Sequence, residues 1–186
     1  MVLEPPYTEI DDQALARAAL RDAQAFDGLY RRHVTAVYRY CFIHIGHQAE
    51  AEEITSQVFL TALETLPSYR GRGPFAAWLM GIARHKCADY HRRHYQNPEV
   101  AIDTAVTLSA PNANPDDRID QARLLDCLRQ ALRQLSPDRR EALQLRFWGG
   151  LSVRDTAVAM RRGQSAVKML VARAISDLQT RCLHDG

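Results

Sequence analysis

The chain has 186 residues, of which 46% are hydrophobic and 25% are charged, and its formal net charge is +2. This balance is typical of a folded globular protein and excludes a wholly disordered chain, a collagen-like chain and a coiled-coil rod. No stretch approaches the roughly 18 consecutive apolar residues of a membrane span, and residues 1–12 are acidic, unlike a secretory signal. We therefore expect a cytoplasmic protein with no membrane insertion.

The small net charge conceals an uneven distribution along the chain. Residues 50–64 hold four acidic residues and no basic one, whereas residues 70–93 hold six basic residues and one acidic residue. Residues 151–186 hold six basic and three acidic residues. Two basic segments on one chain predict two surfaces that face anions.

The cysteines give no sign of a disulfide framework. They form no CxxC pair and are scattered over the chain as Cys41, Cys87, Cys127 and Cys182. We therefore expect reduced thiols, and neither a metal nor a cofactor. The alternative is a zinc site or redox sensor built on Cys87, His91 and His94, whose spacing puts them on one helix face without an evident fourth ligand.

Apolar residues recur at three- and four-residue steps and strand signals are absent, so we expect an all-α fold. Pro67 stops a helix, and Gly- and Pro-rich residues 67–74 form a loop. In chain order, the first half is predicted to hold a short helix capped by Asp11 or Asp12, a long helix that ends near Gly46, a helix over about 49–66 and a helix over 75–94.

Residues 96–118 interrupt this helical pattern. They contain three Pro and three Asn and show no helical period, which predicts a linker between two domains, residues 1–95 and 119–186. After the linker we expect a helix over about 119–134, a helix that begins at Ser136-Pro137, a break at Gly149-Gly150 and two further helices to about residue 182.

The helix over 49–66 has an apolar half and an acidic half when residues are spaced at 100°. The apolar half is predicted to hold Ile54, Val58, Phe59, Ala62, Leu63 and Leu66. The opposite half holds Leu60 among Glu50, Glu53, Gln57 and Glu64. This second face is either a solvated charged surface with one exposed leucine or a docking surface for a protein partner.

The loop and the helix that follows it combine aromatic and cationic residues. Stacking aromatics beside positive charge are what an unpaired nucleic-acid strand needs, although core aromatics beside solvated arginines are the simpler alternative. Leu79, Ala83 and Cys87 are expected to face the core and His91 to share the open face with Trp78. The candidate DNA-binding residues are Tyr69, Arg70, Gly71, Arg72, Trp78, Arg84, His85, Lys86, Arg92 and Arg93.

Residues 151–174 predict a helix-turn-helix, in which Ser152 and Asp155 form a capping box and residues 161–163 form the turn. Val167, Leu170 and Val171 are expected to face inward, together with Ala174 and Leu178. A helical hairpin without DNA contacts is the alternative, but the basic surplus favours DNA binding. The candidate DNA-binding residues are Arg161, Arg162, Ser165, Lys168, Met169 and Arg173.

Three segments, in this order, resemble the sigma-70 family, in particular sigma factors of the extracytoplasmic-function (ECF) type. Residues 49–63 (AEAEEITSQVFLTAL) resemble the helix that binds core RNA polymerase. Residues 69–93 (YRGRGPFAAWLMGIARHKCADYHRR) resemble the promoter-melting and minus-ten segment, and residues 135–178 resemble region 4, which reads the minus-thirty-five element. The resemblance spans about residues 25 to 182 and implies region 2 in the first domain and region 4 in the second.

The resemblance also implies roles for single residues. Glu53, Gln57 and Leu60 would contact core polymerase, the Tyr69–Arg72 loop would capture a flipped minus-ten base, and the second helix of the helix-turn-helix would enter the minus-thirty-five groove. The family often has Asn where His85 stands and a small residue where Arg161 stands. It implies promoter DNA and core RNA polymerase as partners, an inhibitory anti-sigma protein and no enzymatic activity. The alternative is a stand-alone helix-turn-helix regulator.

Overall fold

A computed structural model describes residues 10–95, 127–128 and 130–182. Within these ranges the secondary structure is helical, which confirms the all-α prediction. In chain order the helices are α1 (Asp12–Ala18), α2 (Ala23–Ile45), α3 (Gln48–Thr65), the 3-10 helix η1 (Leu66–Ser68), α4 (Phe75–Tyr95), α6 (Pro137–Phe147), α7 (Val153–Met160) and α8 (Gln164–Cys182). The described residues between 127 and 134 are helical as well.

The helix ends follow from the residues that cap them. The Asp11 carboxylate accepts a hydrogen bond from the Gln13 amide at the start of α1. Gly46 ends α2 in the left-handed region, with a φ of 81° that favours glycine. The Ser152 hydroxyl accepts from the Asp155 amide at the start of α7, as the capping pattern predicts. The predicted linker, residues 96–118, lies outside the described residues.

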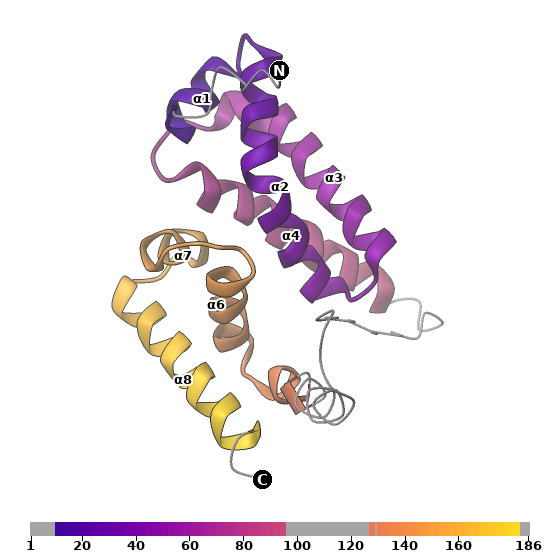
Figure 1. Cartoon of the computed structure of the whole chain (residues 1–186), viewed down its shortest axis with the longest axis vertical. Coiled ribbons are helices and arrows are strands. Elements are labelled where there is room, and N and C mark those ends of the chain that lie inside the picture. Colours follow the sequence, from indigo (N-terminus) through magenta and orange to yellow (C-terminus); the bar gives the residue numbers. More distant parts are fainter. Residues whose placement is uncertain (1–9, 96–126, 129, 183–186) are drawn as a thin grey trace, which may run out of the picture.

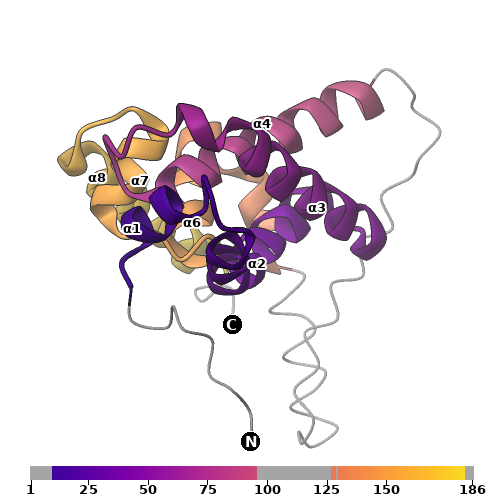
Figure 2. The same ribbon diagram turned by 90° about the horizontal axis from the view of Figure 1, so that it is seen from above.

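The helices form two units that pack against each other. In the first, α2, α3 and α4 pack together and α1 lies against α2, while in the second α8 packs against α6 and α7 (Figure 1). The two units meet where α7 contacts α4 and α6 contacts α2, and α7 lies beside α4 in both views (Figures 1 and 2). None of the helices in the described ranges is long and apolar enough to cross a membrane.

The buried apolar side chains link the two units. One cluster extends from Leu29 in α2 and Leu79 in α4 to Leu145 in α6 and Ala157 in α7. A smaller cluster, made of Leu135, Leu143 and Ala174, lies within the second unit. Because burial of apolar area is the main favourable contribution to folding, the shared cluster holds the two units together.

The expectation of reduced thiols is wrong for two of the four cysteines. Cys127 and Cys182 form a disulfide with Cα atoms 5.8 Å apart, although they are 55 residues apart in sequence. Cys41 and Cys87 are free and buried. Spacing along the chain could not reveal the disulfide, because only the packing of α8 against α6 brings its last residue close to the segment that precedes α6.

Candidate nucleic-acid interface

Three aromatic rings meet where the loop before α4 joins the helix. The ring centroids of Tyr69 and Trp78 are 5.1 Å apart, and each ring lies within 5.5 Å of Phe75. Phe75 is buried, whereas Tyr69 and Trp78 are half-buried. Tyr69 and Trp78 therefore pack on the core, as the simpler alternative expects, and each also keeps an exposed edge.

The loop itself is held by hydrogen bonds from two sides. The Tyr69 hydroxyl donates to the Gly73 carbonyl at 2.6 Å. From α1, the Gln13 side-chain amide donates to the carbonyls of Gly71 at 3.5 Å and Gly73 at 3.4 Å. Gly71 has a φ of 66°, which favours glycine. Gln13 lies about sixty positions from the loop in sequence, and no local pattern marks it as a loop-positioning residue.

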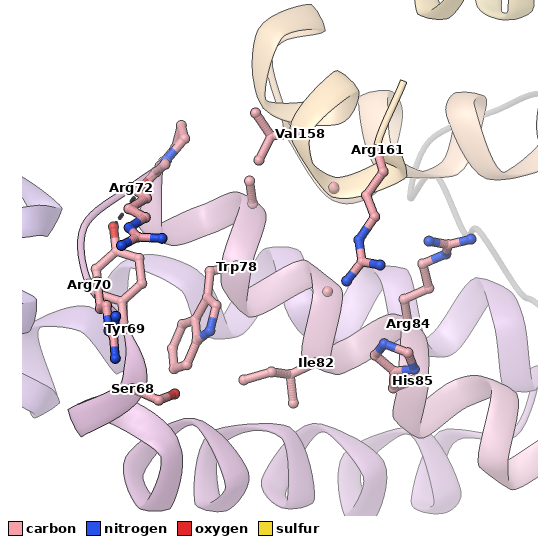
Figure 3. A pocket seen from close by; sticks show the side chains of 15 residues that line it. Ser68, Tyr69, Arg70, Arg72, Trp78, Ile82, Arg84, His85, Val158 and Arg161 are labelled. Atoms are coloured by element: carbon pink, nitrogen blue, oxygen red, sulfur yellow. Dashed lines mark hydrogen bonds between the residues drawn. The ribbon is translucent and has the colours of Figure 1, made fainter. Parts of the chain in front are cut away.

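An open cavity of about 700 Å³ lies between this loop, α4 and α7. Figure 3 shows Tyr69, Arg70 and Arg72 at one end of the cavity, Trp78, Arg84 and His85 along α4, and Val158 and Arg161 opposite them. Arg70, Arg72, His85 and Arg161 are exposed. The cavity therefore combines two aromatic faces with several cationic side chains, a surface suited to unpaired nucleotides.

Some of the predicted cations on α4 already have partners. Arg84 Nε lies 3.2 Å from Glu141 Oε1 in α6. Arg92 forms an ion pair with Asp89 at 2.7 Å, and Arg93 donates to the Asp89 carbonyl. Lys86 is half-buried. The structure therefore does not gather all six predicted α4 residues on one open surface.

Glu141 is the central polar residue between the two units. Its carboxylate accepts a hydrogen bond from the Tyr40 hydroxyl at 2.9 Å in addition to the Arg84 ion pair. Burial raises the pKa of Glu141, while Tyr40 and Arg84 act in the opposite direction. Sequence reasoning missed this residue, because nothing in its local pattern marks a carboxylate that contacts α2 and α4.

His91 does not share the open face of Trp78, so this prediction is wrong. The side chain is half-buried and hydrogen-bonded to the backbone of His44 in α2. Burial lowers the pKa of His91. A uniform 100° step places this residue at the edge of the exposed arc, and the close approach of α2 covers it.

The outward face of α3 carries the predicted acidic residues around an exposed leucine. Leu60 is 60% exposed, and Glu53 and Glu64 are exposed beside it. Gln57 donates to the Glu53 carboxylate at 2.9 Å. Glu50 differs, because its carboxylate accepts a hydrogen bond from the Tyr90 hydroxyl of α4. The face is therefore acidic around Leu60, while the Glu50 carboxylate is occupied by its contact with α4.

Leu63 was predicted on the buried face of α3, and this prediction is wrong. Its side chain is 47% exposed. Ile54, Val58, Phe59, Ala62 and Leu66 are buried as predicted. Leu63 lies at the border of the two halves, where the width of the neighbouring helix decides burial. It extends the apolar surface next to Leu60.

The α7–α8 pair has the predicted faces of a helix-turn-helix. Val167 and Ala174 are buried, and the other inward residues are partly buried. Arg161 ends α7 in the left-handed region, with a φ of 54°. Arg162 forms an ion pair with Asp138 of α6 at 2.6 Å. The candidate DNA-binding residues of α8 are all exposed, namely Ser165, Lys168, Met169 and Arg173.

The alternative zinc site on α4 is not supported. Cys87 is buried beside Cys41, and His94 stacks on Tyr90 and lies 3.9 Å from Glu50. His91 points to the backbone of His44. Over the described ranges, no group of three or more His, Cys, Asp or Glu side chains could hold a metal ion.

Comparison with known proteins agrees with this architecture. The Sigma-70 region 2 family matches residues 29–96, and the Sigma-70, region 4 family matches residues 125–178. Among solved structures, CnrH in complex with the cytosolic domain of CnrY has a TM-score of 0.69 at 22% identity and covers 95% of this chain and 99% of that one. The sigma factor RpoE of Bartonella quintana, in complex with the anti-sigma factor NepR, has a TM-score of 0.64 at 23% identity, over 83% and 94%. These two likenesses show a shared fold.

Relatives with higher identity define the family. The ECF RNA polymerase sigma factor BldN of Streptomyces coelicolor is 35% identical over 89% of this chain, which spans 63% of that protein. The ECF RNA polymerase sigma factor SigD of Mycobacterium tuberculosis is 31% identical over 94% of this chain and 85% of its own length. The chain therefore belongs to the sigma-70 family and is an RNA polymerase sigma factor of the ECF type.

Proposed function

We propose that this chain directs core RNA polymerase to promoters by reading the minus-thirty-five element with α8 and melting the minus-ten element with the 69–73 loop and α4. One observation carries the proposal most strongly. Two half-buried aromatic rings, Tyr69 and Trp78, line an open cavity together with exposed cations. Such a surface offers a π-face for an unpaired base and positive charge for its phosphates.

Docking on core polymerase is proposed for the outward face of α3. Leu60 is a large exposed apolar residue surrounded by Glu53, Gln57 and Glu64. A buried apolar contact with a polar rim is the usual composition of a protein interface. Exposed Leu63 adds to the apolar area, whereas Glu50 contributes less because it is hydrogen-bonded to Tyr90.

Promoter melting is proposed to use binding energy and no chemical step, so we infer that the chain is not itself an enzyme. Extruding a base from the duplex costs a few kcal/mol, and stacking on an aromatic ring contributes about 1–3 kcal/mol per base. The Tyr69 loop is held in advance by Gln13 and by the bond to Gly73. The loop therefore loses little further conformational entropy when it captures a base.

Reading of the minus-thirty-five element is proposed for the exposed face of α8 over residues 165–173. Ser165 and Lys168 would reach base edges in the major groove, and Arg173 would contact phosphate. Met169, half exposed, would offer an apolar contact. The linker, residues 96–118, would pass through a polymerase channel and tie the two reading surfaces together, which raises the effective concentration of each.

We also propose an anti-sigma protein as a regulatory partner. The solved structures that share the fold include a sigma factor in complex with an anti-sigma factor. The acidic face of α3 and the cationic cavity are both exposed and would suit a partner that masks them. Because we propose that the chain acts by binding RNA polymerase, we also propose that it is located in the cytoplasm.

Run-off transcription with purified core polymerase and a promoter library tests the proposal. We expect chain-dependent transcripts whose templates share one sequence at each of the two elements. Core polymerase without the chain is the control and should give no such transcripts. A chain that fails to bind core polymerase but shifts duplex DNA by itself would instead be a stand-alone regulator.

A further inference from the structure

A disulfide at the molecular surface joins the two ends of the second helical unit. Cys127 lies in the helical segment before α6, and Cys182 is the last residue of α8. Both side chains are partly exposed. The Cys127 sulfur lies 3.6 Å from the Arg181 carbonyl oxygen, at an exposed position. A small reagent in solution can therefore reach this pair.

The other two cysteines offer an internal contrast. Cys41 and Cys87 are buried in the first unit, and their sulfurs are hydrogen-bonded to each other. Thiol–disulfide exchange requires a thiolate that a reagent can approach. Solvent reagents are therefore expected to modify Cys127 and Cys182 and to leave Cys41 and Cys87 unchanged.

The disulfide encloses the whole helix-turn-helix. The 55-residue separation between its cysteines contains α6, α7 and nearly all of α8. Among the described residues, the cluster that lies within this unit alone has Leu135, Leu143 and Ala174 as its buried members. A small core depends strongly on cross-links, and a cross-link over a long loop restricts the unfolded chain. Oxidation therefore stabilises the unit that carries α8.

We propose that Cys127 and Cys182 form a reversible thiol–disulfide pair that low-molecular-weight disulfides oxidise, and that reduction loosens the helix-turn-helix. In the first step, a cysteine thiolate attacks one sulfur of the small disulfide and releases one small thiol. In the second step, the other cysteine, as its thiolate, attacks the protein sulfur of the mixed disulfide and releases a second small thiol. Two protein thiols are oxidised, and one small disulfide is reduced to two thiols.

The setting favours a regulated bond. A link between this disulfide and promoter binding rests on the proposed function. That function puts the chain beside RNA polymerase, in a compartment that keeps thiols reduced. Disulfides in such compartments are mostly transient or redox-sensing. A surface disulfide across the promoter-reading unit would thus couple promoter binding to the thiol state of the cell.

The full chain is first equilibrated in buffers of varied reduced-to-oxidised glutathione ratio. Peptide mapping without reductant is expected to find the Cys127–Cys182 cross-link in oxidising buffer and two thiols in reducing buffer. Reduction should lower the melting temperature by on the order of 10 °C. Cys127→Ser should abolish this difference in melting temperature between the reduced and oxidised chain, and Cys41→Ala should keep it. The proposal would be overturned if Cys127 and Cys182 were free thiols at every glutathione ratio. It would also be overturned if the reduced and oxidised wild-type chains had equal melting temperatures.

Run-off transcription then separates this proposal from the proposed function. We expect reduction to lower transcript yield with the wild-type chain and to leave the yield with Cys127→Ser unchanged in the same buffers. Equal yields in both redox states would overturn the promoter coupling while the proposed function stands. A chain inactive in both states that still forms the cross-link would overturn the proposed function and not the thiol pair.

Discussion

Arg161 is the residue at which backbone conformation and the proposed DNA binding make opposite demands. It is the only non-glycine residue with a positive φ in the described ranges, and it ends α7 directly before the turn. The left-handed region costs a residue with a Cβ about 1 kcal/mol or more. An arginine there places a guanidinium on the wall of the cavity, opposite α4 (Figure 3).

Arg161→Gly should therefore raise the free energy of unfolding by about 1 kcal/mol, because glycine adopts this conformation without strain. Arg161→Ala is the matched control, since it removes the same charge and keeps the strain. Both variants should weaken DNA binding equally in a titration with promoter DNA and polymerase. Equal stability of the two variants in urea denaturation would contradict the strain argument.

Tyr69 combines a stacking surface with a hydrogen bond that holds its loop. Tyr69→Ala should impair open-complex formation more than closed-complex binding, because the variant loses the ring on which an unpaired base would stack. Permanganate footprinting of the minus-ten element measures this difference. Tyr69→Phe keeps the ring and loses only the bond to Gly73, so it should retain most of the reactivity. Unchanged reactivity in Tyr69→Ala would remove the base-capture role.

At the scale of single helices, α3 separates its core face from its docking face. Leu60→Asp should abolish binding to core polymerase and leave the fold intact, because the side chain is 60% exposed and lies outside the buried core of the free chain. A pull-down on core polymerase, with circular dichroism for the fold, measures both effects. The control is Leu20→Asp, a leucine outside α3 that is 51% exposed. Retained binding in Leu60→Asp would contradict the assignment of this face.

The contact of α2 with α4 and α6 includes His44, whose side chain is 17% exposed. His44 Nε2 is buried without a hydrogen-bond partner among the described residues and lies 4.0 Å from the Glu141 carboxylate. Burial is the main cause that lowers the pKa of His44 to about 3, and the positive charges of His91, Arg140 and Arg84 lower it further.

This shift predicts a loss of stability in acid. Below the ordinary histidine pKa the unfolded chain binds a proton that the folded chain does not, so stability falls as pH drops from 6.5 toward 3. The full effect is on the order of 5 kcal/mol. Urea denaturation at several pH values should show a shallower acid loss in His44→Gln. His85→Gln, which changes an exposed histidine, should keep the wild-type slope.

At the scale of the whole molecule, the proposed minus-ten surface faces α7, the first helix of the helix-turn-helix, across one cavity (Figure 3). On duplex DNA the two promoter elements are about 25 base pairs apart, or roughly 85 Å at 3.4 Å per base pair. Units in direct contact cannot reach both elements. Under the proposed function, we therefore expect the chain to open before it engages a promoter, and Arg84 to leave Glu141 when it contacts DNA.

Glu141→Gln should favour the open form, because it weakens the contacts with Arg84 and Tyr40 that cross between the units. Small-angle scattering of the free chain should show a larger radius of gyration than for the wild type. Asp138→Asn is the matched control, because Asp138 lies on the same helix and pairs with Arg162 inside the second unit. Equal radii of gyration in Glu141→Gln and the wild type would contradict the idea that the Glu141 contacts hold the two units together.

The sequence alone determined the helices, their ends and most of their faces. Helical spacing, the caps Asp11 and Ser152 and the breaks at Gly46 and Pro67 are local signals, and each depends on residues within a few positions. The same holds for the exposed face of α8 and for Leu60 on α3. Local periodicity suffices to predict which face of a helix is buried wherever one side is plainly apolar and the other plainly polar.

The tertiary structure decided which residues that are distant in sequence contact one another. The Cys127–Cys182 disulfide, the Gln13 bonds to the loop and the Glu141 contacts join positions between 55 and 101 residues apart. Burial at the border of a helix face, as for Leu63 and His91, also depends on the neighbouring helix. Such contacts follow from how helices pack in three dimensions, and helical periodicity carries no information about which helix will lie alongside.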